Sequence, residues 1–167
     1  MLRVQHAPLK LHRMSLNRED FQLLADIRGD DDEDTRLLRE MGAEAKTFIA
    51  GHEWCPPIRS FYLAYGIGDV VALFLVDFTE AIADSPDESL WVVVGDLPSA
   101  YFVSESADTT RAALECYCYI MDDWVAAVVN DTDLEEVYPV DAEPTEENAR
   151  ELQSRVDFLR TEIIPAM

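Results

Sequence analysis

The chain has 167 residues, a formal net charge of −21 and 49% hydrophobic residues. This length can bury the core of one domain, and the apolar content is too high for an intrinsically disordered chain. The charge disfavours nucleic acid, nucleotides and anionic membranes as ligands and favours basic proteins or metal cations.

Acidic residues are concentrated in one half of the chain. Residues 69–148 contain 20 Asp and Glu and a single base, Arg111, for a net charge of −19, whereas residues 1–28 contain five bases and three acids. The sequence shows no secretory signal, no apolar run long enough for a transmembrane helix, and no disulfide framework among its three cysteines. We therefore expect a cytoplasmic protein.

The N-terminal third predicts an arm followed by two helices. Residues 1–14 are expected to form an extended arm. Asn17 is a suitable N-cap for a short helix over about 18–28, which Gly29 ends. The acidic run GDDDEDT (Gly29–Thr35) then reads as a solvated linker that caps a helix over about 35–50. The inward face of that second helix is predicted to contain Leu38, Met41, Ala45 and Phe48.

The middle of the chain predicts strands. After a stiff loop over 51–62, residues 64–81 carry apolar side chains on both alternating faces, which indicates a central strand covered on both sides. Residues 84–89 read as a turn. The segments 90–94 and 100–104 then form a hairpin joined by a longer loop.

The C-terminal third predicts two more helices. Asp108 is expected to cap a deeply packed helix over about 109–130, and Thr145 to open a last helix over about 145–164. An acidic connection over 131–144 joins them. The predicted fold is therefore a single α+β domain over residues 1–167, an antiparallel sheet of three or more strands with two helices before it and two after it.

The stretch LWVVVGDLPSAYFVSES raises the question of whether its Gly95–Ser99 turn is a reactive loop. A hydrolase nucleophile elbow requires Gly-x-Ser-x-Gly between a strand and a helix. Ser99 lacks both glycines, and a strand follows it. We interpret the turn as the bend of a hairpin, and we expect the Asp96 carboxylate to bond the turn backbone.

Three segments together resemble a family of bacterial proteins of unassigned function: LWVVVGDLPSAYF (90–102), MDDWVAAVV (121–129) and SRVDFLRTEI (154–163). The likeness covers about residues 45–164 and is most specific around Trp91 to Tyr101. The resemblance implies a bacterial cytoplasmic protein with one compact domain, and it brings no catalytic residues with it.

The acidic half predicts a non-catalytic binding protein, most specifically a bacterial immunity or inhibitor protein that neutralises a basic toxin such as a nuclease. Carboxylates mimic phosphates in a positive active site, and complementary charge speeds capture. Two loop aromatics near acids are candidate interface anchors. The predicted partner-binding residues are Asp122, Asp123, Asp131, Asp133, Glu135, Glu136, Tyr138, Asp141, Glu143 and Trp54.

Two other functions also fit the sequence. One is an acidic DNA mimic or regulatory adaptor that contacts a basic host protein. The other is a small enzyme with a carboxylate or metal site around Asp69, Asp96 and His52. The leading interpretation includes no catalytic residue, metal ligand or cofactor. The basic segment Met1–Arg28 either folds back on the acidic half or pairs with a second subunit, which would make a homodimer.

Overall fold

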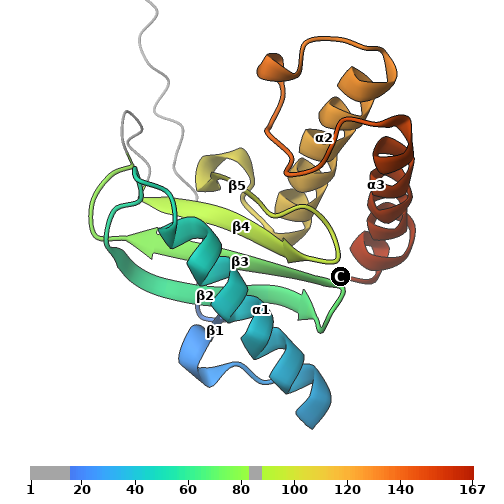
Figure 1. The fold of residues 1–167 in the computed structure, drawn as a ribbon. Coiled ribbons are helices and arrows are strands. Elements are labelled where there is room, and N and C mark those ends of the chain that lie inside the picture. Colours follow the sequence, from blue (N-terminus) through green and yellow to red (C-terminus); the bar gives the residue numbers. More distant parts are fainter. Residues whose placement is uncertain (1–15, 83–87) are drawn as a thin grey trace, which may run out of the picture.

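A five-stranded antiparallel sheet is the centre of the structure, a computed structural model that describes residues 16–82 and 88–167. The strands pair in sequence order from β1 to β5 (Figure 1). They are β1 (Gln22–Leu23), β2 (Ile58–Ile67), β3 (Val71–Phe78), β4 (Ser89–Gly95) and β5 (Ala100–Val103). The helices are α1 (Asp32–Ala50), α2 (Thr110–Val129) and α3 (Glu146–Phe158).

The predicted α+β class with an antiparallel sheet is confirmed, but its helix count is not. Within the described residues, a single α-helix precedes the four long strands, and two follow them. The predicted arm over 1–14 lies outside the described residues, as does most of the predicted turn over 84–89.

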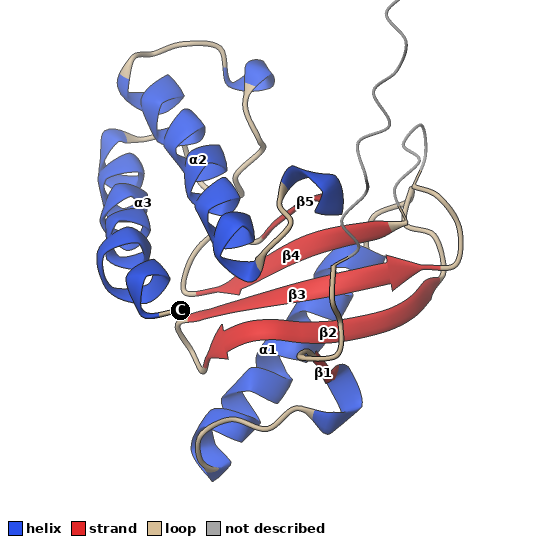
Figure 2. Cartoon of the chain, turned by 180° about the vertical axis from the view of Figure 1, so that it is seen from behind, coloured by secondary structure: helices blue, strands red, loops and turns tan. Residues whose placement is uncertain are grey.

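The sheet separates two hydrophobic cores, because alternate residues of a strand point to opposite faces. Leu73 and Trp91 pack with α2 and α3 on one face, whereas Phe74 and Val92 pack with α1 on the other. The helices accordingly lie on opposite sides of the sheet (Figures 1 and 2). All eight residues of β3 are buried, which confirms the prediction of a central strand.

The acidic run at the start of α1 forms hydrogen bonds that stabilise the fold. Asp31 is the N-cap, and its carboxylate accepts the Asp34 amide at 2.8 Å. Asp34 in turn accepts the amides of Asp30 and Gly68, at 2.9 and 2.8 Å, and so ties the start of α1 to the β2–β3 turn. The helix therefore starts three residues earlier than predicted, and its predicted inward residues are buried except Phe48, which is half-buried.

The predicted helix over 18–28 is wrong. Residues Gln22 and Leu23 pair with β2 instead, and a single 3₁₀ turn follows (Leu24–Asp26). A helix of this length has little stability of its own, so tertiary pairing decides the conformation.

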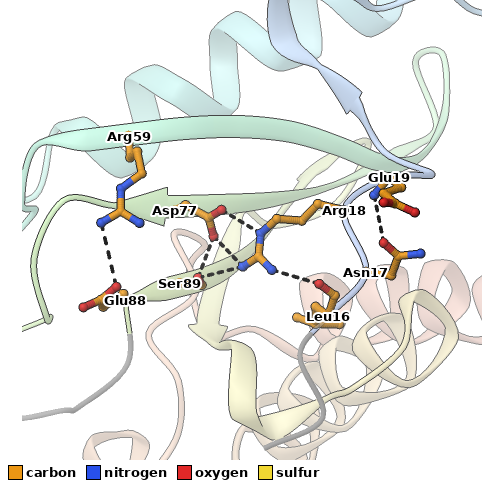
Figure 3. Close-up of polar contacts among 8 residues, drawn as sticks. All are labelled: Leu16, Asn17, Arg18, Glu19, Arg59, Asp77, Glu88 and Ser89. Carbon is orange, nitrogen blue, oxygen red and sulfur yellow. Dashed lines mark hydrogen bonds and ion pairs between the residues drawn. The ribbon is translucent and has the colours of Figure 1, made fainter.

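A partly buried ion pair fixes this N-terminal segment to the sheet (Figure 3). The Arg18 guanidinium donates to both carboxylate oxygens of Asp77, at 2.6 and 2.7 Å, and to the Ser89 hydroxyl at 3.2 Å. Ser89 donates to Asp77 at 2.6 Å, and Arg18 also donates to the Leu16 carbonyl. Asp77 is 8% exposed, and the Asp77 hydrogen bond raises the pKa of Arg18. We call these three residues the Arg18–Asp77–Ser89 network.

The single strand predicted over 64–81 is two strands joined by a tight turn. The Val70 amide donates to the Ile67 carbonyl at 3.0 Å, and Asp69 adopts a positive φ of 65°. Aspartate tolerates this conformation better than most residues do. The predicted loop over 51–62 is correspondingly shorter, because β2 already starts at Ile58.

The β4–β5 hairpin and the two C-terminal helices are confirmed, with small shifts. Thr109 rather than Asp108 caps α2, and Thr145 caps α3 as predicted. The α3 helix continues through a π turn (Leu159–Ile163) into a final 3₁₀ turn.

Candidate functional site

A cavity of about 180 Å³ lies between the β4–β5 turn, α2, α3 and the segment that joins the two helices. Its base includes Trp124 and Leu152, which are 3% and 5% exposed, whereas the carboxylates at its mouth face solvent. The apolar lining residues are Leu97, Pro98, Trp124, Val140, Ala142 and Leu152, and the polar ones are Asp96, Asn148, Glu151 and Arg155.

The β4–β5 turn forms one wall of this cavity and is held rigidly. Gly95 has a φ of 146°, and a Cβ there would lie 2.3 Å from the Val70 carbonyl oxygen, so only glycine fits without rearrangement. The Tyr117 hydroxyl donates to the Pro98 carbonyl at 2.7 Å, and burial raises the pKa of this tyrosine. The turn is thus the bend of a hairpin docked onto α2.

One arginine lies between two carboxylates at the mouth. Arg155 Nε is 3.4 Å from the Asp96 carboxylate, and Arg155 Nη1 is 3.8 Å from that of Glu151. The Asp96 side chain therefore contacts α3, in contrast to its predicted bond to the turn backbone. Both separations are long and all three side chains are well exposed, so these ion pairs are weak.

The segment over residues 131–144, which we call the acidic connection, is held in place by its apolar side chains. Leu134, Val137, Tyr138 and Val140 pack against the core formed by the sheet, α2 and α3. Near its ends, the Thr132 amide donates to the Ala127 carbonyl and the Asn148 side chain donates to the Glu143 carbonyl, both at 2.9 Å. Such contacts order a segment that has only one 3₁₀ turn (Leu134–Glu136).

The carboxylates of the acidic connection all point to solvent. Among the described residues, none of them forms an ion pair with a base. Asp133 accepts the Glu135 amide at 2.8 Å, and Asp131 adopts a positive φ of 51° as the chain leaves α2. The structure thus brings together six of the predicted residues on one exposed segment: Asp131, Asp133, Glu135, Glu136, Asp141 and Glu143.

Tyr138 links the acidic connection to β5. Its hydroxyl accepts the Tyr101 amide at 3.2 Å, and the two rings meet edge to face, 5.9 Å apart. Burial raises the pKa of Tyr138 to about 12. This predicted residue is therefore half-buried and holds the segment in position.

Trp54, the other predicted aromatic, lies in a cluster of rings next to Tyr101. The Trp54 and Tyr101 centroids are 4.9 Å apart, and His52 lies 5.0 Å from Tyr101 and 5.2 Å from Trp54. The His52 Nδ1–H donates to the Phe48 carbonyl at 2.9 Å. Rings this close contact one another directly, and Trp54 is half-buried within this cluster.

Asp122 and Asp123 have different environments although they are adjacent. Asp123 is exposed on α2, as predicted. Asp122 is half-buried instead, and it accepts hydrogen bonds from both terminal nitrogens of Arg160, one of them at 3.1 Å. Gln153 approaches the same carboxylate at 3.4 Å. Asp122 therefore joins α2 to the C-terminal turns and is not free for a partner.

The residues named for the enzyme alternative do not form a metal-type cluster. Asp69 and Asp96 are exposed in adjacent turns, since the Asp96 amide donates to the Val70 carbonyl at 3.1 Å, whereas His52 lies in the aromatic cluster. Within residues 16–82 and 88–167, no three His, Cys, Asp or Glu side chains converge as metal ligands would.

Sequence reasoning missed the α3 side of the cavity and the Arg18–Asp77–Ser89 network. Glu151 and Arg155 are four residues apart on one helix, a spacing that signals a surface pair. Asp77 is an aspartate within a strand of otherwise apolar residues, which signals a buried partner without naming it.

No family model, curated protein or solved structure matches this chain. None of the described helices combines the length and apolar character required to cross a bilayer.

Proposed function

We propose that this protein binds a basic protein partner through the acidic connection, without catalysis, as an immunity-type inhibitor of a basic toxin such as a nuclease. The observation that carries the proposal is that the apolar side chains of this segment pack against the core. Leu134, Val137 and Val140 face the core, so the six carboxylates face solvent as an ordered array.

The ordered backbone of the acidic connection and the charge of its carboxylates favour different steps of partner binding. Like-signed carboxylates raise the rate at which a basic partner is captured, especially at low ionic strength. A segment that is already ordered loses less conformational entropy on binding, so more of the interaction energy appears as affinity. A nuclease active site is positive because it holds phosphates, and carboxylates at fixed spacing are suited to occupy it.

The test is capture by the immobilised 167-residue chain from lysate of the source cells, at low and high salt. The retained basic protein is then purified, and its binding and nuclease activity are measured directly. We expect one basic protein whose on-rate falls steeply with ionic strength and whose activity is inhibited. Retention of a host regulator without nuclease activity would favour the adaptor instead, and the absence of any salt-dependent protein would overturn the proposal.

Charge reversal tests whether the acidic connection is the surface that the partner recognises. The variant Asp133→Lys/Glu135→Lys/Glu136→Lys is expected to lose binding of the purified partner. The matched control, Asp26→Lys/Glu44→Lys/Glu80→Lys, changes the net charge equally at exposed positions elsewhere and is expected to keep most of the affinity. Equal losses in the two variants would show that net charge, rather than the acidic connection, is recognised.

A further inference from the structure

We propose that the cavity beside the acidic connection binds one arginine side chain of the basic partner, an inference that rests on the proposed function. An arginine has a long apolar stem and a charged planar head. The cavity has a lining for each part. Trp124, Val140 and Leu152 form an apolar lining for the stem, and the carboxylates of Asp96 and Glu151 lie at the mouth for the guanidinium.

Arg155 shows that a guanidinium suits this position. It already lies between the Asp96 and Glu151 carboxylates, at 3.4 and 3.8 Å. Those distances are longer than the 2.7–2.9 Å typical of strong charge-assisted hydrogen bonds, and both carboxylates keep free acceptor positions. A second guanidinium, entering from a partner, competes with Arg155 for the same two groups.

The cavity lies next to the acidic connection. Val140 and Ala142 belong to that segment and line the cavity, so the cavity adjoins the segment that carries the exposed carboxylates. The volume of about 180 Å³ is below that of usual small-molecule pockets and suits a single side chain. A desolvated arginine in such a pocket is a frequent hot spot of protein interfaces.

The first experiment uses a blocked arginine, N-acetyl-arginine methylamide, and follows backbone amide shifts of the full chain by NMR. Saturable shifts are expected at Leu97, Asn148 and Glu151, with millimolar affinity because so small a ligand makes few contacts. The neutral isostere, the corresponding citrulline compound, is expected to cause none. Equal shifts with citrulline, or shifts centred on Glu135 and Glu136, would overturn the proposal.

Two pairs of variants sharpen the assignment. Asp96→Asn/Glu151→Gln is expected to weaken arginine binding roughly tenfold, and Asp26→Asn/Glu44→Gln, with the same charge change elsewhere, to weaken it little. Arg155→Ala removes the competitor and is expected to tighten binding more than Arg150→Ala, which changes an exposed arginine of the same helix. Identical effects within each pair would mean that only net charge is sensed, against the proposal.

A cavity-filling variant separates this inference from the proposed function. Ala142→Trp occupies the opening without changing charge, and Ala43→Trp places the same side chain on exposed α1. We expect only the first to weaken binding of the purified partner, at least tenfold. If Ala142→Trp binds normally while the triple charge reversal does not, the cavity inference is wrong and the proposed function stands.

Discussion

The carboxylate of Asp77 and the six carboxylates of the acidic connection lie in opposite environments. Asp77 is 8% exposed and is surrounded by the guanidinium of Arg18 and the hydroxyl of Ser89. The carboxylates of the acidic connection face water and have no basic partner among the described residues. A carboxylate enclosed by donors stabilises the fold, whereas one left in water is available for something outside the chain.

This contrast predicts that substitutions of Asp77 and substitutions in the acidic connection are detected by different measurements. A buried charge that loses its partner is costly, so removing either member of the Arg18–Asp77 pair should be seen in stability. Exposed unpaired charges contribute little to folding and act mainly through their field.

The largest effect is expected for Asp77→Ala. The change leaves the half-buried Arg18 without its carboxylate partner and should lower the free energy of unfolding by about 3 kcal/mol, measured by urea denaturation. Glu88→Ala is the control, since Glu88 forms an exposed pair with Arg59 at 3.8 Å, and it should cost less than about 0.5 kcal/mol. Similar losses in both variants would contradict the assigned role of Asp77.

The adjacent residues Asp122 and Asp123 offer the same comparison within one helix. Asp122→Asn weakens the pair with Arg160 and should destabilise the protein by about 1 kcal/mol, because the pair is only partly shielded from water. Asp123→Asn should be neutral. An equal response of the two variants in thermal unfolding would mean that the Arg160 contact contributes nothing.

Tyr138→Phe tests how the acidic connection is held. Loss of the hydroxyl leaves the Tyr101 amide without its acceptor and should cost about 1 kcal/mol. Hydrogen exchange at the Tyr101 amide should accelerate, while amides in the centre of β3 remain protected. Unchanged exchange at Tyr101 would show that the hydroxyl does not hold the segment.

Alkaline pH tests the same tyrosine in the wild-type chain. Its pKa is raised to about 12 by burial, above the value near 10 of an unfolded chain, so folding favours the neutral phenol. Its contribution is complete below about pH 10 and is lost as the pH rises towards 12. Unfolding measured across this range should show a smaller decline for Tyr138→Phe than for wild type, and parallel curves would contradict the assignment.

The smallest effect on folding is expected for the triple reversal Asp133→Lys/Glu135→Lys/Glu136→Lys. All three side chains are exposed, and the one hydrogen bond lost, from the Glu135 amide to Asp133, is exposed too, so the free energy of unfolding should fall by no more than about 0.5 kcal/mol. Loss of binding with an unchanged thermal midpoint is the signature of a recognition surface. A clear fall in the midpoint would show that these carboxylates support the fold.

The parts of the fold that the sequence predicts are those with strong local patterns. The β4–β5 hairpin, α2 and α3 have regular periodicity and recognisable caps, and their bounds are close to those predicted. The sequence does not predict the first part of β2, because register shifts between Ile58 and Ser60 and between Leu63 and Tyr65 break the alternation of this strand.

Long-range contacts explain the remaining differences. The segment after Arg18 pairs with β2 and is anchored to Asp77, 59 residues away, and no local pattern reports such a contact. The exposed acids of the acidic connection follow from composition. The cavity could not be predicted from the sequence, because its lining residues come from four separate parts of the chain: the β4–β5 turn, α2, the acidic connection and α3.

The hydrogen bond between Tyr138 and the Tyr101 amide has a consequence for self-association. The β5 strand is one of the two outer strands of the sheet, β1 being the other, and an unprotected outer strand can pair with another chain and so start aggregation. Tyr138 occupies one of the backbone donors needed for such pairing, and the charges beside it repel a second copy of the chain. The acidic connection thus hinders growth of the sheet by strand addition at its β5 edge.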